Sequence, residues 1–206
     1  MKLYVTPPSP RAFKVVAVLH HLGLPAEMVY VDLLNGQHMR PDFAALNPNR
    51  KMPVLDDDGF LLWESNAIVR YLAAKHRAQM LEPADLHARA HANAWMDWQL
   101  SVLGPAITPC FVGLVRTPPE KRDYPAIEES KKKTTEAVAI LDGELAKRAF
   151  VAGDIFSYGD IPSAVMANRY RQLVPERPAF KNFERWFAAI AARPAFRSQV
   201  AAVPLV

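Results

Sequence analysis

The stretch that decides the fold is Asn47–Lys75, NPNRKMPVLDDDGFLLWESNAIVRYLAAK. A short apolar run begins at Pro53, which suits the first residue of a strand because proline has no N–H to donate. Asp57–Gly59 supplies turn chemistry, and the apolar run Phe60–Trp63 is the return strand. A helix then opens after Glu64, with apolar residues at helical spacing. The sequence therefore predicts a β-hairpin that runs directly into a helix.

The start of this helix has the properties of an anion site. A helix N-terminus leaves backbone N–H groups unpaired and carries the positive end of the helix dipole. Glu64 and Ser65 add polar side chains at the same corner. Pattern alone thus indicates a site for an anion without identifying it.

The order of these residues resembles the glutathione-binding half of the glutathione S-transferases. The pattern of that family is Asn-Pro, an apolar residue before a cis-proline, a hairpin, and Glu-Ser at a helix start. Here it reads Asn47-Pro48, Met52-Pro53 and Glu64-Ser65. The resemblance implies a cis Met52–Pro53 bond and identifies the anion as glutathione.

The segment before the hairpin alternates strands and helices. Leu3–Val5 is an expected strand, broken by Pro7-Pro8. Ser9 is placed as an N-cap with proline at the first helical position, and the helix closes at Gly23. A second strand follows at 27–31 and one helical turn at 41–46. The predicted order is β-α-β-(α)-β-β-α, with a parallel crossover between the first two strands. The resemblance identifies this arrangement as an α/β thioredoxin-like N-terminal domain, residues 1–77.

The rest of the chain is expected to form an all-α C-terminal domain, residues 86–206, after a linker at 76–88. A long helix begins near Asp85 and is expected to kink or end at Gly104-Pro105 and Pro109. Further helices are expected at about 124–148, 180–192 and 194–202. Ser157 and Asp160 form a capping box, flanked by Phe156 and Ile161 as a hydrophobic staple. We interpret this box as a folding element.

Composition narrows the function classes. The 206 residues are 50% hydrophobic and 22% charged, as in ordinary globular proteins. The absence of an uninterrupted apolar run of about eighteen residues predicts no membrane span, and the N-terminus lacks a signal-peptide core. The single Cys110 cannot form an intrachain disulfide, which favours a cytoplasmic location.

The charged residues and the histidines do not indicate a nucleic-acid partner or a metal site. The net charge is +4, but the one basic run, Lys131–Lys133, lies among glutamates and reads as a solvated helix face rather than a nucleic-acid surface. His87 and His91 have metal-pair spacing without a third ligand, so we expect surface histidines and no metal site.

The chemistry of glutathione needs its thiolate, and the unperturbed thiol has a pKa of about 8.5. Ser9 could donate to the sulfur at the positive end of the first helix. The stretch Ser9-Pro10-Arg11-Ala12-Phe13-Lys14-Val15 resembles the Ser-Pro-x-x-Arg-Lys-Val of serine-type transferases, with Phe13 at the arginine position. The residues alone favour Ser9 as only an N-cap, and the resemblance is what makes it catalytic.

Two other residues are alternatives to Ser9 as the thiol contact, and one class of chemistry is disfavoured. Tyr4 lies inside the strand and is expected to pack, whereas Thr6 lies close to the same corner and remains open as the thiol contact. Cysteine-type enzymes place cysteine where this chain has Pro10, which disfavours disulfide chemistry.

The resemblance assigns the remaining glutathione contacts. Glu64 and Ser65 hold the γ-glutamyl group, and the backbone of Met52, fixed by Pro53, meets the cysteinyl part. Lys51 and His38 bind the glycyl carboxylate. Without the resemblance, Lys51 and His38 would be read as solvated loop residues.

A hydrophobic second substrate is expected on the first helix of the second domain. The expected pocket walls, each of which could instead be core, are Trp98, Ser101, Leu103, Ile107 and Phe111.

The sequence thus predicts a cytoplasmic, homodimeric, serine-type glutathione S-transferase that joins glutathione to hydrophobic electrophiles. The resemblance places the dimer interface on the helices at 65–75 and 85–104. Other glutathione chemistry (isomerisation, dehalogenation or peroxide reduction) and a non-catalytic assembly module remain alternatives.

Overall fold

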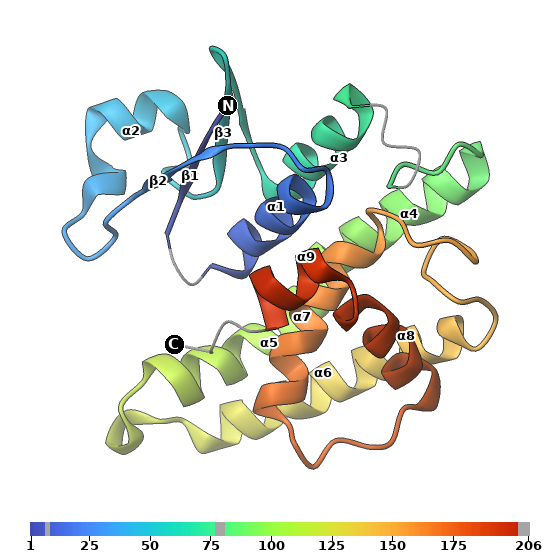
Figure 1. Ribbon diagram of the computed structural model, residues 1–206. Coiled ribbons are helices and arrows are strands. Elements are labelled where there is room, and N and C mark those ends of the chain that lie inside the picture. The colour runs from blue at the N-terminus through green and yellow to red at the C-terminus, as the bar shows by residue number, and fades with distance from the viewer. Residues whose placement is uncertain (7–8, 77–80, 202–206) are drawn as a thin grey trace. The chain divides into compact units, whose positions relative to one another are not determined.

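A computed structural model describes residues 1–6, 9–76 and 81–201 (Figure 1). The chain divides into two compact units, Met1–Ala78 and Gln79–Val206, and each is described by itself. The predicted Pro7-Pro8 break, residues 77–80 of the predicted linker and residues 202–206 of the predicted second domain lie outside the described residues.

The first unit is built on a four-stranded sheet in the order β2-β1-β3-β4. The strands are β1 (Lys2–Val5), β2 (Glu27–Tyr30), β3 (Val54–Asp57) and β4 (Phe60–Trp63). β1 runs parallel to β2 and antiparallel to β3, and β3 and β4 form the predicted hairpin. Asp58 and Gly59 take positive φ values of 54° and 95°, the conformation that a tight hairpin turn requires.

Helices cover both faces of this sheet. α1 (Pro10–His21) and α3 (Ser65–Lys75) pack together on one face, and η1 (Gln37–Met39) and α2 (Pro41–Leu46) lie on the other (Figure 1). Side chains alternate along β1, so that Tyr4 and Val54 join an apolar cluster with Phe43 of α2. The resulting α/β architecture is the thioredoxin-like fold that the sequence predicts.

An ionic contact fastens α3 to the hairpin. Tyr71 donates a hydrogen bond of 2.5 Å to Asp57, and Lys75 forms an ion pair with the same carboxylate. These two donors hold the pKa of Asp57 below its ordinary value. These contacts fix the C-terminal half of α3 to the hairpin.

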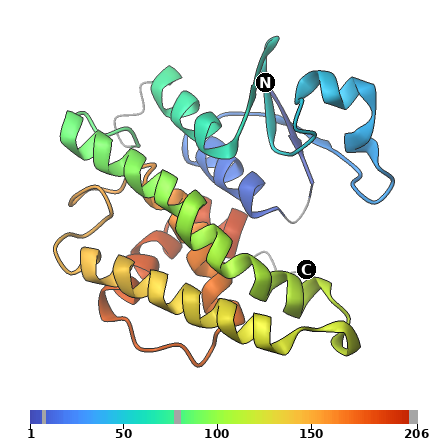
Figure 2. The same ribbon diagram turned by 180° about the vertical axis from the view of Figure 1, so that it is seen from behind.

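In the described part of the second unit every regular element is helical. A long helical stretch comprises α4 (Leu86–Trp98), η2 (Gln99–Leu103), α5 (Gly104–Phe111) and η3 (Val112–Arg116). η4 (Pro119–Lys121) and α6 (Tyr124–Leu145) follow. The last elements are α7 (Asp160–Leu173), α8 (Lys181–Ala191), α9 (Pro194–Phe196) and η5 (Arg197–Ala201). α5 lies beside α6 and also packs on α7 (Figure 2).

The prolines of the long stretch do not end it, which the sequence left open. A π turn at η2 precedes Pro105, and a second one at η3 follows Pro109. The wider turn accommodates a proline because Pro105 has no N–H to place in the regular hydrogen-bond ladder. Gly104 permits it, since a Cβ there would lie 2.9 Å from the carbonyl oxygen of Gln99.

One predicted helix end needs correction. α6 stops at Leu145 rather than 148, because a tight turn begins there and Phe150 pairs with Gly153 in an isolated bridge. The helix predicted at 194–202 is present as α9 continued by a π turn through Ala201, and residue 202 lies outside the described residues.

The start of α7 is closed by a buried network around Asp160. Its carboxylate accepts hydrogen bonds from the Val151 N–H (2.9 Å), the Ser157 N–H (2.9 Å) and the Trp186 indole (2.8 Å). The Ser157 hydroxyl accepts from the Gly159 N–H, so the predicted capping box forms with a donor N–H one residue earlier than expected. Burial raises the pKa of Asp160 to about 6, against the lowering effect of these donors.

By length and composition, the continuous stretch Leu86–Arg116 could cross a membrane, contrary to the sequence expectation. Core helices of soluble proteins meet the same criteria. The apolar side chains of Met96, Leu103, Ile107 and Cys110 are buried, and α5 packs on α6 and α7. These contacts bury one side of the stretch, and 28% of its apolar window is buried.

Candidate functional site

The sheet brings the predicted glutathione residues to one edge. Val54 pairs with both Tyr4 and Trp63, so the end of β1, the start of β3 and the end of β4 lie side by side. Thr6 follows β1 and Met52 precedes β3 at this end of the sheet. α1 and α3 start at this same edge, which therefore collects two helix N-termini.

The start of α3 is chemically open. Glu64 is the N-cap, with φ 70° and ψ 113°, and its side chain makes no capping hydrogen bond. A positive φ is unusual for a residue with a side chain and marks a position held by its surroundings. Ser65 is only 2% exposed, yet its hydroxyl has no hydrogen-bond partner. A buried hydroxyl without a partner is costly, so this corner fits a ligand that would supply the missing bond.

Ser9 occupies the start of α1. Its Oγ accepts a hydrogen bond of 3.4 Å from the Ala12 N–H, and the side chain is half-buried. A serine hydroxyl can accept from the backbone and still donate its own proton. The N-cap and the thiol contact are therefore compatible roles for Ser9.

Lys14, to which the sequence interpretation gave no function, is buried between the two helix starts. Its Nζ donates a hydrogen bond of 3.1 Å to Asn66 of α3. Burial, and secondarily Arg11, lower the pKa of Lys14 to about 7, while Glu64 opposes that shift. The sequence feature that could have indicated this burial is the position of Lys14 beside the apolar residues Val15 and Val18 of an amphipathic helix.

The loop before β3 is shaped by Asn47. Its amide donates to the Lys51 carbonyl (2.7 Å), and its side-chain oxygen accepts from the Asn49 N–H (2.9 Å). The Met52–Pro53 bond is cis, as predicted, and both residues are buried. The Lys51 side chain is exposed at this edge and can pair with an anion.

His38 lies in η1, at the side of the sheet that carries α2. Its Nδ1 is buried and has no hydrogen-bond partner. Together with the Ser65 hydroxyl, it is an unsatisfied polar atom of the first unit. An incoming ligand or water would satisfy it.

The rivals to Ser9 lie close by. Tyr4 packs edge-on against Phe43, with ring centroids 6.4 Å apart, as the sequence predicts. Thr6 is half-buried at the end of β1.

The residues expected to line a second-substrate pocket separate into two groups. Leu103 and Ile107 have no exposed surface, and they belong to the core because η2 packs on α7 and α5 packs on both α6 and α7. Phe111 is 5% exposed, and its ring lies against the guanidinium of Arg169. Trp98 is half-buried against Trp95, with ring centroids 4.8 Å apart, and the exposed Ser101 donates to the Asp97 carbonyl.

Residues 1–6, 9–76 and 81–201 contain no group of three or more metal-ligating side chains. His87 and His91 both lie on the exposed side of α4.

Comparisons with known proteins agree with this geometry. The profile of the glutathione S-transferase N-terminal domain matches residues 1–74, and that of the C-terminal domain matches residues 91–194. Glutathione S-transferase GstB of Escherichia coli is 42% identical over 91% of both chains. Glutathione S-transferase 3 of Zea mays is 35% identical, over 100% of this chain and 95% of its own.

Solved structures of the same kind superpose on the whole chain. A theta class glutathione S-transferase from Xanthomonas axonopodis pv. citri, with glutathione bound, has a TM-score of 0.94 at 33% identity and covers 100% of this chain and 98% of its own. Glutathione transferase F7 from Populus trichocarpa has a TM-score of 0.83 at 29% identity, with 96% of each chain covered. The chain belongs to the glutathione S-transferase family.

Proposed function

We propose that this protein is a serine-type glutathione transferase that joins the glutathione thiolate to hydrophobic electrophiles. The observation that carries the proposal is the open corner at the start of α3, where the buried Ser65 hydroxyl lacks a partner beside the exposed Glu64. Membership of the family and the named relatives support the same activity.

Glutathione would be held at both ends. The γ-glutamyl carboxylate would accept from Ser65 at the positive end of α3, while Glu64 would pair with the γ-glutamyl ammonium. The backbone of Met52 would meet the cysteinyl part, and Lys51 and His38 would bind the glycyl carboxylate. These contacts would place the sulfur near the start of α1.

The chemical step would follow from stabilising the sulfur anion. The Ser9 hydroxyl would donate a hydrogen bond to the sulfur, and the dipole of α1 would add to it, so that the thiol pKa falls by one or two units from about 8.5. The thiol proton leaves to solvent. The thiolate then forms the new carbon–sulfur bond, and where the electrophile carries a leaving group, that group departs with the bonding pair.

Substitution of Ser9 by alanine tests the catalytic assignment. We expect kcat for conjugation to fall by about tenfold or more, because one thiolate hydrogen bond is lost, while glutathione affinity stays close to wild type. Thr6→Ala is the matched control and should retain activity. Wild-type turnover in Ser9→Ala, or a loss in Thr6→Ala alone, would transfer the role to Thr6.

The physiological setting is also a proposal. We expect a cytoplasmic homodimer, in keeping with the free and buried Cys110 and with the exposed apolar side chains Phe60, Leu61 and Trp63 on β4. Light scattering after size exclusion would give the mass of a dimer; a monomeric mass would contradict this part. Assaying glutathione with haloaryl, epoxide and peroxide substrates distinguishes conjugation from the related chemistries.

A further inference from the structure

Four arginines of the second unit lie over aromatic rings. Three of them are buried or half-buried, and one of these three has no counter-charge among the described residues. Arg169 is 7% exposed, and its guanidinium carbon lies 3.6 Å from the centroid of the Phe111 ring. Within the described chain it makes no hydrogen bond or ion pair, and its Nε is buried without a partner. The nearest charge that affects it is a second cation, Arg116.

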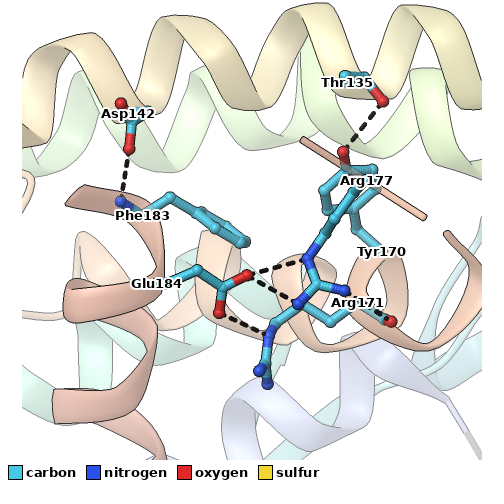
Figure 3. Close-up of polar contacts among 7 residues, drawn as sticks. All are labelled: Thr135, Asp142, Tyr170, Arg171, Arg177, Phe183 and Glu184. Atoms are coloured by element: carbon cyan, nitrogen blue, oxygen red, sulfur yellow. Dashed lines mark hydrogen bonds and ion pairs between the residues drawn. The ribbon is translucent and has the colours of Figure 1, made fainter. Parts of the chain in front are cut away.

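The other two stacked arginines differ in this respect. Arg171 lies over Phe187. It donates a hydrogen bond of 3.1 Å to Glu184, which also binds Arg177 (Figure 3). Arg193 lies over Phe156, and its charge is balanced by the buried carboxylate of Asp160. Among the three, only Arg169 faces a like charge instead of an acid.

Arg116 completes the arrangement. It is exposed at the end of η3, with its guanidinium carbon 5.3 Å from the centroid of the same Phe111 ring. Burial, and secondarily Arg116, lower the pKa of Arg169 to about 10, so both groups remain charged at neutral pH. A contact with an aromatic face offsets only part of the cost of burying an unpaired guanidinium.

We propose that Arg169 and Arg116 form a binding site for an organic carboxylate, beside the ring of Phe111. A guanidinium presents a planar fork of donors that matches a carboxylate, and the unbonded Nε of Arg169 is one arm of that fork. The exposed Arg116 supplies the second charge. The aromatic ring between them favours a ligand whose carboxylate is attached to an apolar body. This site lies within the second unit and goes beyond the proposed conjugation activity.

Calorimetric titration of the full chain with 4-nitrobenzoate and with the neutral 4-nitrobenzamide tests the site. The two probes differ in charge and share the same ring. We expect the acid to bind about tenfold more tightly than the amide, as one charge-assisted contact implies. Arg169→Gln should abolish that preference, and Arg116→Gln should reduce it.

Arg171→Gln is the matched control, because it removes a stacked arginine whose charge Glu184 already balances, and it should keep the preference. If Arg169→Gln does not fold, the charge reversal Arg116→Glu, at an exposed position, tests the proposal instead. This variant must bind the acid more weakly and bind the amide as the wild-type protein does. Equal binding of acid and amide to the wild-type protein, or an unaltered preference in Arg116→Glu, would overturn the proposal.

Discussion

The starts of α3 and α7 each carry a buried serine close in sequence to an acidic residue, and they differ in which groups satisfy these side chains. At α7 the Asp160 carboxylate and the Ser157 hydroxyl are fully engaged with groups of the same unit. At α3 the Ser65 hydroxyl has no partner, and Glu64 makes no cap. The closed start of α7 contributes to folding, whereas the partnerless Ser65 hydroxyl at α3 is the feature on which the proposed glutathione site rests.

The comparison predicts its largest effect for Asp160→Ala. Three buried donors would lose their acceptor, so we expect the free energy of unfolding to fall by about 3–5 kcal/mol. Asp154→Ala, an exposed acid in the preceding loop, should change it little. Denaturant unfolding measures both variants, and an Asp160→Ala protein as stable as wild type would remove the distinction between the two helix starts.

The pH dependence of stability gives a second, smaller effect. The native pKa of Asp160 is raised to about 6 from an ordinary value of 3.8, so the native state holds the proton longer than the unfolded chain. Stability from this group is therefore present below about pH 4 and is lost as the pH rises to about 6. Two pKa units correspond to about 3 kcal/mol at most. Unfolding curves across this range should show the decline in wild type but not in Asp160→Ala.

A glycine beside the closed start provides the third test. A Cβ at Gly159 would lie 2.7 Å from the Cα of Ala92 in α4, so Gly159→Ala should cost about 1–3 kcal/mol of stability. A Cβ at Gly143 in α6 would meet nothing within 4 Å, and Gly143→Ala should stabilise by about 0.5–1 kcal/mol. Equal melting temperatures for the two variants would show that the α4–α7 approach is looser than described.

Features set by local sequence were predictable. The hairpin turn at Asp58-Gly59, the N-cap at Ser9 and the helix after Glu64 depend on residues adjacent in the chain, and the structure has all three. The cis bond before Pro53 came from the family resemblance, because proline pattern alone favours the trans form.

Features set by distant contacts were not predictable. The burial of Lys14 depends on Asn66, fifty-two residues away, and Trp186 joins Asp160 across twenty-six residues. Leu103 and Ile107 were expected as possible pocket walls, but helix periodicity cannot say which neighbour covers an apolar face, and both are core. The unbalanced charge of Arg169 likewise becomes visible only when Phe111 and Arg116 are seen beside it.

The central claim is that the open start of α3 binds glutathione and the closed start of α7 does not. Its most direct test is calorimetric titration of wild type, Ser65→Ala and Ser157→Ala with glutathione. The account predicts a roughly tenfold or larger loss of affinity in Ser65→Ala with undiminished stability, because a hydrogen bond to a charged ligand is lost. It predicts wild-type affinity in Ser157→Ala, with a loss of about 1 kcal/mol in stability. Wild-type affinity in Ser65→Ala, or a greater loss of affinity in Ser157→Ala, would contradict it.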